Sequence, residues 1–125
     1  MQPVGSQGPQ PQEIVHAWLA EAHASGEADT WTGKRSQHRH EWNANLDIYP
    51  VTSRRRATSV LATARDISET GLGFRCRKKF DRGSQVLICR AGEEQAVPAT
   101  VSACTQSVGG YLIGVWFDFG PTATD

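Results

Sequence analysis

Two alternating runs between residues 42 and 65 constrain the fold of this chain more than any other feature. Apolar side chains at positions 42, 44, 46 and 48 alternate with polar ones at 43, 45 and 47, and a similar alternation runs from Val60 to Arg65. Alternation with a period of two is typical of a strand with one buried face. Polar residues at 52–54 separate the runs, which predicts an antiparallel hairpin turning there.

Two short charged motifs lie at the open ends of this hairpin. Arg35 and Arg39 form an RxxxR spacing before the first run, and residues 66–71 form a DxSxxG spacing after the second. Antiparallel pairing should set residues near 39 and 40 opposite residues near 66. Because a slip of one residue would reverse every side chain, the pattern predicts the proximity of the two motifs and not a specific pair.

The residue types of the two motifs suit one kind of ligand. Arginine offers a planar fork of donors that matches phosphate oxygens or the O6 and N7 edge of guanine. Asp66 is an acceptor for the N1–H and N2 donors on the other guanine edge, and Ser68 adds a small donor and acceptor. Gly71 would permit a positive φ and a close approach of the backbone to the ligand. Together they favour an anionic guanine nucleotide.

The order of these motifs, followed by Gly71-Leu72-Gly73-Phe74 and a late Ile113-Gly114-Val115-Trp116-Phe117, resembles the PilZ domain. PilZ domains are bacterial receptor modules for cyclic di-GMP, and the resemblance covers roughly residues 33–119. It implies a mainly β fold, a six-stranded antiparallel β-barrel, here with an N-terminal α-helix.

The resemblance also implies a role for each motif residue. Arg35 and Arg39 would grip the phosphates and contact guanine from a loop, and Asp66, Ser68 and Gly71 would read the guanine edge from the barrel surface. Lys34 stands where a basic residue is common in the family, and it resembles the versions that take up two stacked ligand molecules. These six residues are the expected ligand-binding site.

The rest of the chain divides into a disordered tail at 1–12, a helix and loop at 12–32, the barrel at 33–119 and a short tail at 120–125. The helix, expected at 12–25, carries one apolar face that should cover an open barrel end or a partner protein. Many PilZ domains have a helix after the last strand, but the C-terminal tail is too short for one, so the N-terminal helix is expected to take its place. The remaining strands are expected near 72–78, 84–91, 95–106 and 110–118.

Charge and cysteine content restrict the class of protein. The formal net charge is zero, yet residues 34–79 hold eleven Lys and Arg against four Asp and Glu, so positive charge is concentrated around the expected anion site. The three cysteines form no CxxC pair, which predicts neither a disulfide framework nor a zinc site. With no leader-like or membrane-spanning apolar run, a cytoplasmic protein without membrane insertion is expected.

The preferred interpretation is a bacterial, non-enzymatic cyclic di-GMP receptor or adaptor that needs no cofactor. Ligand binding would order the RxxxR loop and change the surface presented to an unidentified downstream protein. One alternative is a ligand-independent PilZ-like interaction module, and the other is a small nucleic-acid-binding β-barrel, which the zero net charge disfavours. Both a monomer and a homodimer are compatible with the sequence.

Overall fold

The computed structural model describes residues 10–25, 39–51 and 58–119. It contains one helix and seven strands, with the following bounds: α1 (Pro11–Ser25), β1 (His40–Glu41), β2 (Asn45–Pro50), β3 (Val60–Ile67), β4 (Gly71–Cys76), β5 (Gln85–Arg90), β6 (Ala96–Ser107) and β7 (Gly110–Phe117). Helix α1 and strands β3 to β7 agree with the sequence predictions. The alternating run at 42–48 differs, because β2 begins only at Asn45, residues 42–44 lie in no strand, and the short strand β1 was not predicted. Of the tail predicted at 1–12, residues 1–9 lie outside the described residues, whereas Pro11 and Gln12 belong to α1. Residues 26–38, the predicted turn at 52–54 and the tail at 120–125 also lie outside the described residues.

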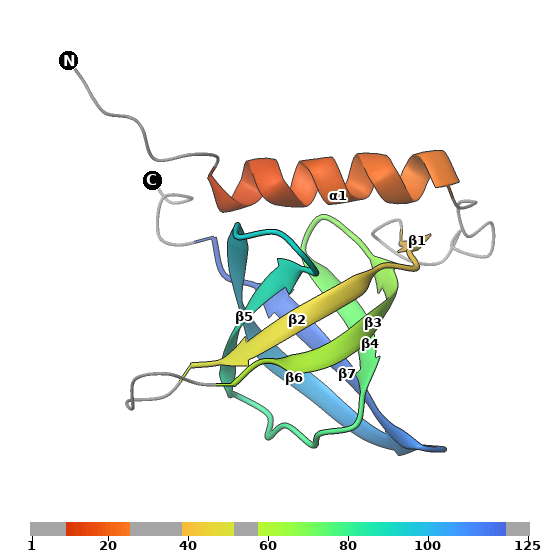
Figure 1. Cartoon of the computed structure of the whole chain (residues 1–125), viewed down its shortest axis with the longest axis vertical. Helices are drawn as coiled ribbons and strands as arrows, with labels where there is room; N and C mark the ends of the chain where they lie inside the picture. Colours follow the sequence, from red (N-terminus) through yellow and green to blue (C-terminus); the bar gives the residue numbers. More distant parts are fainter. Residues whose placement is uncertain (1–9, 26–38, 52–57, 120–125) are drawn as a thin grey trace.

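The strands form a closed antiparallel barrel (Figure 1). Strands follow the order β3-β2-β5-β6-β7-β4, and β4 pairs back with β3 to close the barrel. The two-residue strand β1 pairs with β3 as well, beyond the end of β2. The mainly β, six-stranded barrel with an N-terminal helix is therefore confirmed.

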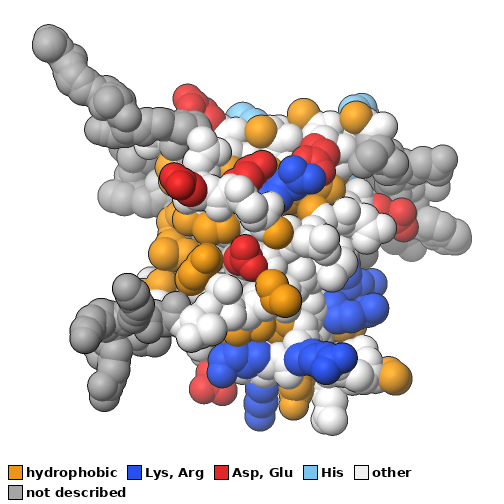
Figure 2. All heavy atoms as spheres, viewed as in Figure 1, with side chains coloured by type: hydrophobic (Ala, Val, Ile, Leu, Met, Phe, Trp, Pro, Cys, Tyr) orange, Lys and Arg blue, Asp and Glu red, His pale blue; other side chains and the backbone are white. Residues whose placement is uncertain are grey.

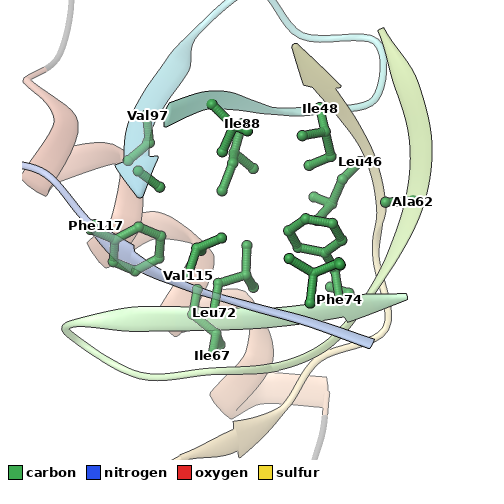
Figure 3. Packing of buried hydrophobic residues seen from close by; sticks show 14 of the residues in the cluster. Leu46, Ile48, Ala62, Ile67, Leu72, Phe74, Ile88, Val97, Val115 and Phe117 are labelled. Carbon is green, nitrogen blue, oxygen red and sulfur yellow. The ribbon is translucent and has the colours of Figure 1, made fainter. Parts of the chain in front are cut away.

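The barrel interior holds the hydrophobic core (Figure 3). Leu46 and Ile48 of β2 have no exposed surface, and the same is true of Phe74 on β4 and Ile88 on β5. Full burial of such a side chain contributes about 1.5 to 3 kcal/mol, so the alternating apolar positions are the main source of stability. The alternation read from the sequence thus corresponds to the inner and outer faces of the barrel.

Helix α1 lies across one end of the barrel (Figure 1). Proline suits its first position, where the missing N–H would have no intrahelical partner. Its apolar face is buried against the core, and the rings of Trp18 and Trp42 lie 5.4 Å apart. Glu21 accepts hydrogen bonds from Arg90 at 2.8 Å and from Trp42 Nε1 at 3.4 Å. Of the two predicted roles for this face, covering the barrel end is the one observed.

The three cysteines are free thiols. Burial raises the pKa of Cys76 and of Cys89 above the ordinary value of 9.0. Both thiols are therefore protonated near neutral pH.

Within the described part of the chain, no helix has the length and apolar character needed to cross a bilayer.

Candidate functional site

The pairing of β1 with β3 brings the ends of the two charged motifs together. His40 lies opposite Ile67, and Glu41 lies opposite Asp66. Arg39 directly precedes β1, and its Nη2 donates a hydrogen bond to Asp66 Oδ1 at 2.8 Å. The proximity of the motifs predicted from the hairpin is confirmed for these residues.

A β-bulge turns Asp66 toward the outside of the barrel. The register between β3 and β4 shifts between Ala64 and Asp66, which leaves Arg65 as an extra residue on β3. Ala62 and Ala64 face the core before the bulge, and Ile67 faces it afterwards. Without the extra residue, the alternation would direct Asp66 into the core. A bulge re-aims side chains in this way, and here it leaves the Asp66 carboxylate partly exposed.

Gly73 provides the room that the Asp66 carboxylate occupies. It is the residue of β4 that pairs with Asp66, and a Cβ placed on it would come within 2.7 Å of Asp66 Oδ1. Any larger residue at this position would displace the carboxylate. The sequence alone does not reveal this role of Gly73, because the role depends on the register between β3 and β4.

Ser68 is directed into the turn that follows Asp66. Its side chain is fully buried, and Oγ accepts hydrogen bonds from the backbone N–H groups of Gly71 at 3.2 Å and Thr70 at 3.3 Å. The N–H of Ser68 donates to the carbonyl of Gly71 at 2.9 Å. These bonds give Ser68 a structural role in the turn, and a direct contact with the ligand stays a prediction.

Gly71 is required by packing and not by its backbone conformation. The glycines with positive φ among the described residues are Gly83, Gly92 and Gly109, so Gly71 does not use the positive φ that a glycine permits. A Cβ on Gly71 would lie 2.5 Å from the carbonyl oxygen of Val115 on β7. The glycine therefore allows β4 to approach β7 closely, a contact that the sequence does not reveal.

Glu41 is a further charged group at this place that the sequence analysis missed. It is exposed and lies opposite Asp66, so two carboxylates share this part of the barrel wall with the guanidinium of Arg39. Like charges across a strand pair repel one another and also repel phosphate. Arg39 is thus the group here that attracts an anion, and the two carboxylates can accept hydrogen bonds from donors.

Two of the expected ligand residues, Lys34 and Arg35, lie outside the described residues.

Over the described ranges, no cluster of three or more His, Cys, Asp or Glu could hold a metal ion. A shallow hollow of about 770 Å³ is lined by residues of the β4–β5 turn, β6 and β7, including Arg82 and Trp116. Arg39 and Asp66 do not line this hollow, and their side chains are partly exposed.

A family model described as PilZ domain matches residues 33–125. The chain belongs to the PilZ domain family. PilZ domains are binding modules, and membership implies the general class of cyclic di-GMP-binding receptors and adaptors. The match begins just before the RxxxR motif and includes the DxSxxG motif, so both motifs lie inside the PilZ region. No curated protein matches the chain.

Proposed function

We propose that this PilZ domain is a cyclic di-GMP receptor whose ligand binds on the outer barrel wall beside β1 and the end of β3. The observation that carries the proposal is the ion pair between Arg39 and Asp66, one residue from each motif, at 2.8 Å. It supports the proposal, because a side chain suited to phosphate and a side chain suited to the guanine edge lie side by side.

The two groups that form this ion pair are the same groups that would bind the ligand. The guanidinium of Arg39 matches a phosphate, and the carboxylate of Asp66 matches the N1–H and N2 donors of guanine. The pair is partly exposed, so its own contribution is about 0.2 to 1 kcal/mol. A charged contact with a partly desolvated ligand contributes about 2 to 4 kcal/mol. Exchange of the ion pair for ligand contacts is therefore favourable.

The remaining motif residues complete the proposed site from the loop before β1. Arg35 would bind phosphate together with Arg39, and Lys34 would supply further positive charge for a second stacked ligand molecule. Closure of residues 33–40 over the ligand would order this loop against the barrel. The closed loop would gain contacts with the ligand and lose conformational entropy. Hydrogen exchange of these amides should slow on ligand addition.

The contacts of residues 40–42 support α1 as the element that reports binding to a downstream protein. His40 packs edge-on against His23 of α1 with ring centroids 5.5 Å apart, and Trp42 packs against Trp18. His40 directly follows Arg39 and Trp42 lies three residues after it, so a movement of Arg39 toward a phosphate would be transmitted to α1. In this proposal the partner recognises a changed position of α1 in the cytoplasm.

Isothermal titration calorimetry tests the proposed binding of cyclic di-GMP. The parent chain, Arg39→Ala and Asp66→Ala would each be titrated with cyclic di-GMP, GTP and cyclic di-AMP. Arg82→Ala and Asp47→Ala are matched controls, because they remove the same kinds of charge elsewhere on the barrel. We expect saturable binding of cyclic di-GMP alone, weakened more than tenfold in both site variants and unchanged in the controls. The stoichiometry gives the number of ligand molecules.

Absence of binding in the parent chain, by calorimetry and by a second method, would contradict the receptor and favour the ligand-independent interaction module. Tight, strongly salt-dependent binding of RNA or DNA would favour the nucleic-acid-binding alternative. The role of α1 has a separate readout. Ligand should change the tryptophan fluorescence of the parent chain, and this change should be much smaller in Trp18→Phe while the affinity is retained.

A further inference from the structure

We propose that the barrel end opposite α1 binds the surface of an anionic lipid membrane. This end consists of the exposed residues Arg75, Arg77, Lys78, Lys79 and Arg82 together with Val108 at the tip of the β6–β7 hairpin, and it is called the basic end below. The inference does not depend on cyclic di-GMP binding.

Charge is divided unequally over the described residues. Five of their eight Lys and Arg lie between Arg75 and Arg82, where Asp81 is the one carboxylate. Elsewhere, the described residues carry three Lys and Arg and nine Asp and Glu. Figure 2 shows most blue side chains toward the end away from α1, whereas red side chains gather near the helix. A protein with zero net charge therefore has one strongly positive end.

An exposed aliphatic side chain lies beside this charge. Val108 is 98% exposed at the turn of the β6–β7 hairpin. The base of this hairpin adjoins the basic run, because Tyr111 of β7 pairs with Cys76 of β4 and a Cβ placed on Gly110 would lie 3.4 Å from the Cα of Arg77. Figure 1 shows the β4–β5 loop and this hairpin tip at the same end of the barrel. Basic side chains around a protruding apolar tip suit lipid headgroups and the acyl boundary beneath them.

The aromatic residues distinguish a membrane from a nucleic acid as the partner. Single-stranded nucleic acids bind through basic grooves with exposed aromatic rings on which bases stack. Phe80 is the one aromatic residue in the basic run, and it is buried against Phe74. The run from Arg75 to Arg82 and the hairpin tip thus offer charge and an aliphatic side chain but no exposed ring of their own. Trp116, which is 54% exposed, shares its hollow with Arg82 and with none of the other four basic residues.

Co-sedimentation with lipid vesicles tests the inference on the full chain. Vesicles of phosphatidylcholine would be compared with vesicles that also contain phosphatidylglycerol, at low and at high salt. We expect binding to the anionic vesicles only, weakened by salt. Arg77→Gln with Lys79→Gln should lower the partition coefficient about 25-fold, since each basic residue near an anionic surface contributes about fivefold. Val108→Thr, which keeps the shape of the side chain, should lower it severalfold.

Gln12→Glu with Gln95→Glu is the matched control, because it makes the same change in net charge at exposed positions outside the basic end. This variant should bind vesicles as the parent chain does, and circular dichroism should show all variants folded. Equal binding to neutral vesicles, no binding to anionic vesicles, or an equal loss in the control would each overturn the proposal. Preference for an oligonucleotide over anionic vesicles would also overturn it.

Discussion

Arg39 and Asp66 are 27 residues apart in the chain, yet Arg39 Nη2 lies 2.8 Å from Asp66 Oδ1 on the outer wall of the barrel. Both side chains are about one-quarter to one-third exposed, at 27% and 31%. The pair is accessible to a competing ligand and too exposed to be a main source of stability. Mutations here should therefore separate ligand binding from folding.

Exchange of the two residues tests that separation directly. In Arg39→Asp with Asp66→Arg, the ion pair can form again with reversed polarity, so the free energy of unfolding should change by less than about 1 kcal/mol. Binding of cyclic di-GMP should be abolished, because the charges now face the wrong ligand groups. Urea unfolding and calorimetry on the same samples give both values. Retained binding in the exchanged variant would show that the ligand lies elsewhere.

Substitution of Gly73 should remove binding with little effect on folding. The Cβ of Gly73→Ala would meet Asp66 Oδ1 at 2.7 Å, and a rotatable carboxylate can move away. Gly114→Ala is the matched control, because Gly114 pairs with Gly73 on β7 and its Cβ would lie in ordinary contact, 3.5 Å from Ser102 Oγ. Calorimetry should show at least a tenfold loss of affinity in Gly73→Ala and none in Gly114→Ala. Equal affinities would exclude a positioning role for Gly73.

Removal of the Ser68 hydroxyl should destabilise the protein. Ser68→Ala leaves the backbone N–H groups of Thr70 and Gly71 without the oxygen they share, which should lower the free energy of unfolding by about 1 to 3 kcal/mol. Ser102→Ala removes a half-buried hydroxyl that donates one bond to Gly114, and it should have a smaller effect. Urea unfolding compares the two. Unchanged stability with lost ligand binding would instead support direct reading of guanine by Ser68.

Stability should decline at alkaline pH partly because of Cys89. Burial raises the pKa of this thiol above 9.0, and the carboxylates of Asp47 and Glu93 raise it further. Above pH 9.0 the unfolded state releases a proton that the folded state still holds, so the free energy of unfolding falls as pH rises through the folded pKa. Below this window the thiol has no such effect.

Urea unfolding from about neutral pH to about pH 10 measures this decline. Cys89→Ala should flatten it, whereas Thr105→Ala, an exposed substitution on β6, should leave its slope unchanged. An identical slope in the parent chain and in Cys89→Ala would contradict the assignment to Cys89.

Much of the site could be predicted because it depends on short-range patterns. Alternation at Leu46 and Ile48 indicates a strand whatever its neighbours are, and a hairpin necessarily brings its open ends together. This reasoning placed residues near 39 and 40 beside residue 66, and the observed pairs follow it. The apolar spacing of α1 likewise predicts a helix with one buried face.

Other parts of the site could not be predicted, because they depend on contacts between strands that are distant in the chain. Strict alternation would direct Asp66 inward, and only the bulge at Arg65 reverses it. The need for glycine at 71 and 73 arises from an oxygen of β7 and an oxygen of Asp66, respectively. The placement of Glu41 opposite Asp66 depends on the register of β1.

The sequence by itself determined the strands, the helix and the meeting of an arginine motif with an aspartate motif, because local periodicity and hairpin geometry suffice for these. Only the tertiary structure decided which side chains reach the surface and which serve the fold: Asp66 is turned outward, while Ser68 is buried in its turn. Closure of the barrel also divided the charge between a carboxylate-rich helix end and a basic end. The physical reason is that register, bulges and close backbone contacts arise only when distant strands pair.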